Sequence, residues 1–169
     1  MGFTFLRPSF LTQSLVTMVA PMVSRAGLLI APFAHASIAM IDARDIAECA
    51  IAALTDPAPV DQAWHVTGPR GVTLDDIAAH LGVRYVPIPR RLAGRGLARQ
   101  GLPAFEIEHA MRMAAYFSAG VDGAPTDHVL RLAGRPARPV QTLLDEHRPL
   151  FAPASRVARL LSRTSILED

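Results

Sequence analysis

Short strand-like runs alternate with helical patterns along most of this chain, and this alternation constrains the fold more than any other feature. The expected strands are short, rich in β-branched or aromatic residues, and bounded by proline or glycine. They cover residues 3–6, 28–30, 37–41, 63–67 and 83–86. The expected helices, where apolar residues recur at helical spacing, cover residues 10–20, 46–55, 74–81, 103–119, 126–133 and 141–147. This order indicates an α/β or α+β fold and argues against an all-helical one.

Polar residues and proline set the expected helix boundaries. Ser9 is expected to cap the helix at 10–20, and Pro21 should end it because a proline inside a helix lacks the N–H that the turn requires. Asp42 and Asp45 have the spacing of a capping box. We prefer this interpretation to a catalytic carboxylate pair, because a carboxylate at a helix start satisfies free N–H groups. Thr73 is expected to cap a later helix in the same way.

All seventeen basic residues are arginine, and the sequence contains no lysine. The chain therefore offers no Schiff-base amine, no phosphate-binding-loop lysine and no lysine to lower the pKa of a tyrosine. Its two tyrosines are followed four residues later by Pro89 and Gly120, so neither begins a Tyr-x-x-x-Lys pair. The formal net charge is only +2, and aromatic residues are not interleaved with the arginines. We therefore predict no nucleic-acid partner.

Motifs of several common site types are missing from the sequence. No G-x-G-x-x-G opens a helix after a strand, and there is no G-x-S-x-G or H-E-x-x-H. The six histidines show no metal-ligand spacing. We therefore assign no catalytic and no metal-binding residue. Residues 94–96 (GRG) are expected to form a flexible basic loop.

Three arginines would form one stripe if their segment is helical: Arg91, Arg95 and Arg99. We expect a solvated basic face, with an NADP phosphate or the acidic face of a partner as alternatives.

Cysteine usage and hydropathy bear on where the protein works. The single cysteine, Cys49, excludes an internal disulfide and any C-x-x-C zinc site, which fits a reducing cytoplasm. Its neighbours at helical spacing are apolar, so we expect a core position. Residues 9–36 are apolar, but Pro21 and Arg25 interrupt them before the roughly 20 residues of a membrane span are reached. We predict a cytoplasmic protein with no membrane partner.

Six segments resemble, in the same order, motifs of the NmrA-like atypical short-chain dehydrogenases/reductases, a branch of the NAD(P)-binding Rossmann superfamily. The first resembles the family's "LRP-x-x-F-M-x-N" motif, the second "D-V-R-D-I-A", the third "Y-x-L-T-G-P" and the last "L-T-G-R-P-P". The segments are residues 6–14 (LRPSFLTQS), 41–47 (IDARDIA), 64–69 (WHVTGP), 73–81 (TLDDIAAHL), 85–89 (YVPIP) and 130–136 (LRLAGRP). The chain departs from the family at Thr12, Ser14 and Ala133.

The resemblance implies the C-terminal part of a short-chain-dehydrogenase Rossmann fold, with edge strands and a small helical substrate lobe. We expect one domain over residues 1–151 and a loosely structured tail over 152–169. The N-terminal dinucleotide-binding half, with its glycine-rich turn, is then expected to be absent from this chain. Without that half, an open strand edge should favour a homodimer, aggregation or a complementing Rossmann half.

The resemblance also implies the site residues. It places Pro8, Ser9 and Phe10 near the nicotinamide of bound NAD(P)H, since a loop leaving the carboxyl end of a strand is where open α/β sheets bind ligands. A plain turn with Ser9 as the helix cap is the alternative. Gln13 and Ser14 would face the substrate.

The implied function is an NAD(P)H-dependent oxidoreductase that reduces a small carbonyl or quinone-type molecule, incomplete and inactive as this chain alone. One alternative is a non-catalytic redox sensor that binds dinucleotide and a protein partner. The other is a truncated remnant.

Overall fold

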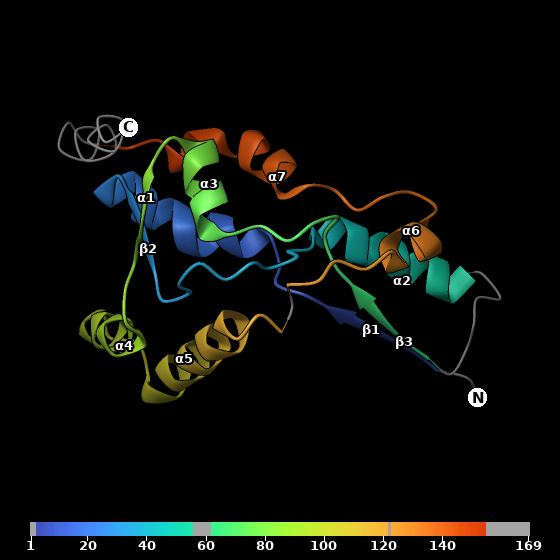
Figure 1. Ribbon diagram of the computed structural model, residues 1–169, viewed down its shortest axis with the longest axis horizontal. Coiled ribbons are helices and arrows are strands. Elements are labelled where there is room, and N and C mark those ends of the chain that lie inside the picture. Colours follow the sequence, from blue (N-terminus) through green and yellow to red (C-terminus); the bar gives the residue numbers. More distant parts are fainter. Residues whose placement is uncertain (1–2, 56–61, 122, 155–169) are drawn as a thin grey trace.

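The computed structural model describes residues 3–55, 62–121 and 123–154, and its strands form two separate parallel pairs (Figure 1). In the first pair, β1 (Thr4–Pro8) lies beside β3 (Gln62–Val66), with Leu6 opposite Trp64. In the second pair, β2 (Leu28–Ala31) lies beside β4 (Arg84–Pro87). The α/β prediction is therefore correct for the described residues.

The helices cover both pairs and also form a separate hairpin. They are η1 (Leu15–Val19), α1 (Ala20–Ala26), α2 (Ala43–Thr55), α3 (Leu74–Leu81), α4 (Arg90–Arg99), α5 (Ala104–Ser118), α6 (His128–Ala133), α7 (Val140–Glu146) and η2 (Arg148–Phe151). In Figure 1, α1, α3 and α7 gather around the β2–β4 pair, and α2 and α6 lie beside the β1–β3 pair. The α4–α5 hairpin lies below the β2–β4 group and to the left of the β1–β3 pair. None of the described helices is long and apolar enough to cross a membrane.

Two apolar cores follow from this arrangement. The larger joins η1, α1, β2, α3 and α7, and Val23, Leu29 and Leu144 are completely buried in it. The smaller lies between α2, α6 and the β1–β3 pair, and it contains Cys49 and Val66. Cys49 therefore has the predicted core position, and burial raises the pKa of its thiol.

The first strand is longer than expected because Pro8 does not disturb its pairing. The N–H of Ser9 donates to the carbonyl of Val66 at 3.1 Å, so the nitrogen of Pro8 points to the opposite edge. The proline therefore removes no hydrogen bond between β1 and β3, and the strand continues through it.

The first helix differs from the prediction at both ends. Residues 10–12 are not helical; the amide of Thr12 donates to the carbonyl of Ile41 at 2.9 Å. Ser9 is therefore not the helix cap. The helix starts at residue 13 and continues through Pro21 to Ala26, where Gly27 ends it at φ 67°. Pro21 is tolerated because the π-type turn η1 precedes it and α1 begins anew there.

Residues 37–41 form two isolated bridges, Ile38 with Val72 and Ile41 with Leu11, and not a strand. The backbone around Met40 passes very close to the backbone at Gly68. A Cβ atom on Gly68 would lie 2.0 Å from the carbonyl oxygen of Met40, so only glycine fits at that position.

The predicted boundaries of α3 and the predicted end of α6 are confirmed. Thr73 accepts a hydrogen bond from the amide of Asp76 and the side chain of Asp76 accepts one from the amide of Thr73, which makes a full capping box on α3. Gly82 and Gly134 end α3 and α6 with positive φ angles.

Residues 94–96 are helical, so the predicted basic loop is wrong. Gly94 lies in α4 next to Ile107 and Met111 of α5, and a Cβ there would lie at an ordinary contact distance of 3.6–3.8 Å from them. Close packing on α5 outweighs the low helix propensity of glycine. The structure describes residues 152–154 of the predicted tail, and the rest of the tail, 155–169, lies outside the described residues. The assignment of a single domain to residues 1–151 remains a prediction.

Candidate active-site loop and its supports

The loop after β1 brings together aromatic side chains from three elements. Phe10 follows β1, Phe33 follows β2, and Phe117 belongs to α5. The ring of Phe10 lies 5.1 Å from that of Phe117 and 6.3 Å from that of Phe33, both in edge-to-face geometry. The carboxyl ends of β1 and β2 therefore meet at one aromatic cluster, which also joins the α4–α5 hairpin to the rest of the fold.

Ser9 lies at the centre of this loop and is 8% exposed. Its hydroxyl is buried and has no hydrogen-bond partner among the described residues. A buried hydroxyl without a partner is costly, by about 1–3 kcal/mol. Pro8 beside it is exposed at the end of β1.

Gln13 fastens the loop to the start of α2. Its amide nitrogen donates to Oδ1 of Asp42 at 2.9 Å, and its amide oxygen accepts from the backbone N–H of Ala43 at 3.0 Å. The amide of Ile41 also donates to the carbonyl of Phe10 at 2.9 Å. Both ends of the Gln13 amide are thus occupied within the chain, and its assignment to substrate stays a prediction.

Ser14, also predicted to face substrate, begins the π-type turn. Its amide donates to the carbonyl of Leu11 at 3.1 Å, and its side chain makes no capping hydrogen bond. Ser14 is half-buried, like Gln13 before it. Its role at the substrate stays a prediction.

Asp42 is a structural carboxylate. Burial by itself raises the pKa of Asp42, but hydrogen bonds from the side chain and backbone of Arg44 and from Gln13 lower it to about 2. Its Oδ1 accepts the backbone N–H of Arg44 at 2.8 Å at the first turn of α2, as the cap prediction requires. Arg44 bridges onward to Glu146 of α7 at 3.0 Å.

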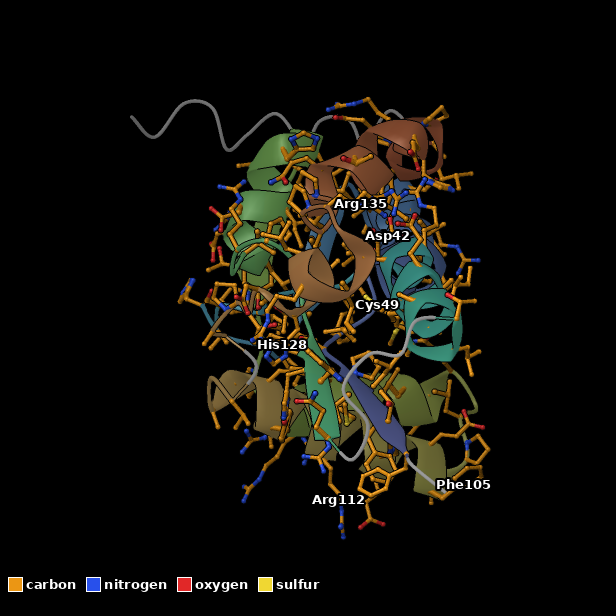
Figure 2. All side chains as sticks on the ribbon, turned by 90° about the vertical axis from the view of Figure 1, so that its right-hand side faces the viewer. Asp42, Cys49, Phe105, Arg112, His128 and Arg135 are labelled. Carbon is orange, nitrogen blue, oxygen red and sulfur yellow. The ribbon has the colours of Figure 1, made fainter. Side chains whose placement is uncertain are left out.

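Asp45 does not complete the capping box. It is fully buried and lies 2.7 Å from the guanidinium of Arg135 and 2.7 Å from the backbone N–H of Arg138. The guanidinium of Arg138 also donates to it, and Glu48 pairs with both arginines. Figure 2 labels Arg135 of this cluster, together with Asp42 at the start of α2. Sequence spacing could not reveal this cluster, because its partners are about 90 residues apart.

The two edges of the β1–β3 pair differ. On the β3 side, the N–H of His65 donates to Nδ1 of His128 at 2.9 Å, and the hydroxyl of Thr126 donates to the carbonyl of His65 at 2.5 Å. These hydrogen bonds close that edge, and the sequence did not predict them. Among the described residues, β1 pairs only with β3; Phe3 just before β1 is 48% exposed, and Phe5 within it is 55% exposed.

Two further features of the described residues concern ligands. A shallow groove of about 320 Å³ lies between α2 and α6, away from the loop after β1; it is lined by Glu48, Ile51, Ala52, Thr55, Leu132 and Ala133. No cluster of three or more histidine, cysteine, aspartate or glutamate side chains among the described residues could hold a metal ion.

The chain has curated relatives among reductases, although no family model matches it. It is 32% identical over 165 residues to an NAD(P)H azoreductase of Xenophilus azovorans, covering 91% of this chain and 56% of that protein. It is 34% identical over 158 residues to a (4-alkanoyl-5-oxo-2,5-dihydrofuran-3-yl)methyl phosphate reductase of Streptomyces griseus, covering 89% and 55%. The chain thus spans about half the length of the curated relatives it matches.

Solved structures share the fold. An NADPH-dependent quinone oxidoreductase of Escherichia coli, complexed with NADPH, superposes with a TM-score of 0.80 at 19% identity, over 86% of this chain and 53% of that one. A triphenylmethane reductase of Citrobacter sp., complexed with NADP(H), gives 0.78 at 17% identity, over 86% and 53%. The fold is therefore Rossmann-like α/β, and together with the sequence relatives it confirms the resemblance seen in the motifs. These relatives and the shared fold support the assignment of this chain to the NmrA-like atypical short-chain dehydrogenase/reductase family.

Proposed function

We propose that this chain is the substrate-side, C-terminal half of an NAD(P)H-dependent reductase of small molecules, and that it works together with a dinucleotide-binding half. The observation that carries this proposal is the loop Pro8–Ser9–Phe10 at the carboxyl end of β1, packed on aromatic side chains from β2 and α5. Open α/β sheets bind ligands at such ends. The sequence has no glycine-rich turn for the phosphates of the cofactor, so the other half must supply it.

The uncovered side of β1 supports a complementing half. The edge of β1 opposite β3 has no described partner strand, and another layer would cover the exposed side chains of Phe3, before β1, and Phe5, within it. On α2, which packs over β1, Leu54 is 87% exposed and Ala47 is exposed as well. An added strand beside β1 and a helix beside α2 would bury these side chains together.

The residues present fit the nicotinamide end of NAD(P)H. Pro8, Ser9 and Phe10 would line it, and the buried hydroxyl of Ser9 lacks a partner that a polar ligand group could supply. The cofactor, when bound, supplies the hydride. Phe10, Phe33 and Phe117 would exclude water and pack against an apolar acceptor.

Gln13 would act on the site by holding the loop in place, through its two hydrogen bonds to Asp42 and Ala43. Ser14 would line the substrate side beside it.

A redox-sensing role is the second candidate, and one observation favours it. The sequence contains no lysine, and the hydroxyl of Tyr85 donates to the carbonyl of Ala31 at 3.1 Å inside the fold. This chain therefore contributes no Tyr–Lys acid–base pair, which a sensor does not need.

A chimera tests the proposal and separates the two candidates. It joins this chain to the part of the azoreductase that the chain does not match, and NADPH oxidation is followed with a quinone and an azo acceptor. We expect turnover, and we expect Phe10→Ala to lower kcat/KM by about tenfold, equivalent to about 1.4 kcal/mol. Met18→Ala, on the exposed side of the following helix, is the matched control and should have no effect.

The possible outcomes separate the candidates. A chimera that binds NADPH but reduces no acceptor would favour the sensor. A folded chimera that fails to bind NADPH would contradict both functions.

A further inference from the structure

The positive charge of this protein is concentrated in the α4–α5 hairpin. Residues 90–118 contain five arginines and two glutamates, a net charge of +3, whereas the rest of the sequence has twelve arginines and thirteen acidic residues. On α4, Arg91, Arg95 and Arg99 follow one another at four-residue intervals and are all exposed. They belong to none of the ion pairs found among the described residues, unlike Arg135 and Arg138.

Large apolar side chains are exposed on the same hairpin. Phe105, in the first turn of α5, is 70% exposed, the most of any aromatic side chain in the described part of the chain. Leu92 on α4 is 53% exposed. Residues 100–103 connect the two helices, so Phe105 and Arg99 lie on either side of the hairpin tip.

The hairpin is peripheral. No residue of α4 is buried, and α4 packs mainly against α5 through Gly94. Figure 1 shows α4 and α5 below the β2–β4 pair and to the left of the β1–β3 pair, and Figure 2 shows Phe105 and Arg112 at the lower edge of the molecule. The tip can therefore meet a flat surface without moving the cores.

We propose that the tip of the α4–α5 hairpin docks onto an anionic lipid bilayer, with Phe105 entering the interface and Arg95 and Arg99 meeting lipid phosphates. Basic side chains beside an exposed aromatic are the combination that interfacial binding uses, because electrostatic attraction and apolar burial add. A free polyanion would explain the arginines but not the exposed Phe105 and Leu92. This inference is independent of the proposed reductase activity, and it requires no membrane-spanning segment.

Vesicle flotation of the 169-residue chain tests the proposal. Bound protein rises with the vesicles in a density gradient, whereas aggregates sink, so self-association does not obscure the result. The vesicles contain either phosphatidylcholine alone or phosphatidylcholine with 30% phosphatidylglycerol. We expect flotation only with the anionic vesicles, and a loss of binding between 0.05 and 0.5 M salt because screening weakens exposed charges.

Charge and apolar variants should separate the two contributions. Arg95→Glu with Arg99→Glu should reduce the bound fraction at least about tenfold, since each basic residue near an anionic surface contributes strongly. Phe105→Ser should weaken binding without changing its salt dependence. Arg70→Glu with Arg84→Glu makes the same charge change at exposed positions outside the hairpin and should have a smaller effect.

Three results would overturn the proposal. They are no flotation with anionic vesicles, equal loss in the two double variants when circular dichroism shows both folded, and binding to heparin but not to vesicles. The last result would identify a soluble polyanion as the partner.

Discussion

The two edges of the β1–β3 pair are built in opposite ways. Along β3, Thr126 and His128 bond the backbone of His65 and close the edge, and the Asp45 cluster ties the following segment to α2. Along β1, the described residues provide no partner strand, and Phe3 and Phe5 are exposed. Side chains of this chain therefore hydrogen-bond the β3 edge, whereas the β1 edge is suited to pair with a further strand of a larger sheet. The difference indicates where a second half would attach.

The largest expected effect is on the closed side, at Asp45. Asp45→Ala would leave Arg135 and Arg138 without their buried carboxylate, and breaking a buried ion pair by removing one partner costs about 3–5 kcal/mol. Glu48 still pairs with both arginines, so we expect a loss of about 3 kcal/mol in the free energy of unfolding, measured by urea denaturation. Asp127→Ala, which breaks an exposed pair at 3.9 Å, is the control and should change stability by less than about 0.5 kcal/mol. Equal effects of the two substitutions would show that the cluster does not hold the closed side.

Acidification should weaken the hydrogen bond by which Asp42, at the start of α2, holds Gln13 and the loop after β1. The pKa of Asp42 is lowered from 3.8 to about 2 in the folded protein, so its stabilisation is fully present above pH 4 and is lost as the pH falls through 2. A shift of this size corresponds to about 2 kcal/mol. Urea midpoints measured between pH 5 and pH 2 should fall more steeply for the natural chain than for Asp42→Asn. Parallel pH profiles of the two proteins would contradict this role of Asp42.

Removing the hydrogen bond between Thr126 and His65 at the β3 edge should have a smaller effect on the free energy of unfolding. Thr126→Val removes the hydroxyl that donates to the carbonyl of His65, and we expect a loss of about 1–1.5 kcal/mol. Hydrogen exchange at the amide of His65 should become faster, because the β3 edge then opens more easily. Thr55→Val is the matched control, since the Thr55 hydroxyl donates to the carbonyl of Ile51 at the exposed end of α2. Unchanged exchange at His65 would mean that Thr126 does not close this edge.

The open edge should show the smallest effect on stability and a clear effect on association. Phe5 is 55% exposed, so Phe5→Glu should change the free energy of unfolding by less than about 0.5 kcal/mol. It should, however, lower the self-association of the isolated chain, measured by sedimentation velocity, because a charge on an open strand disfavours pairing. Leu130→Glu introduces the same charge on α6, at a side chain that is 49% exposed on the closed side, and should leave self-association unchanged. If Leu130→Glu lowered self-association more than Phe5→Glu, the surface that associates would lie on the α6 side and not at the β1 edge.

The sequence predicted those parts of the fold whose causes are local. The capping box of Thr73 and Asp76 and the glycine that ends α3 act within a few residues, so spacing alone located them. The predicted helix end at Pro21 was wrong, because the effect of this proline depends on the π-type turn before it. The helix α4 was missed because Gly94 and Gly96 have low helix propensity and only packing on α5 compensates.

Long-range contacts limited the site predictions more severely. The cluster of Asp45 with Arg135 and Arg138, and the contact of Phe10 with Phe117, join positions about 90 to 110 residues apart. The motifs still placed Pro8, Ser9 and Phe10 at the carboxyl end of the first strand, because the strand pattern of residues 3–6 is a local signal, and their role at the site stays a prediction. They could not reveal that Gln13 is engaged by Asp42.

Thermal unfolding of the 169-residue chain, with and without millimolar NADPH, tests the central claim most directly. A ligand that binds only the folded state at a hundredfold excess over its Kd stabilises that state by about 2.7 kcal/mol. Because we assign the phosphate-binding part of the cofactor site to another half, we predict the same Tm in both samples. A Tm raised by several degrees would show that this chain holds a complete NADPH site by itself, and would contradict the account.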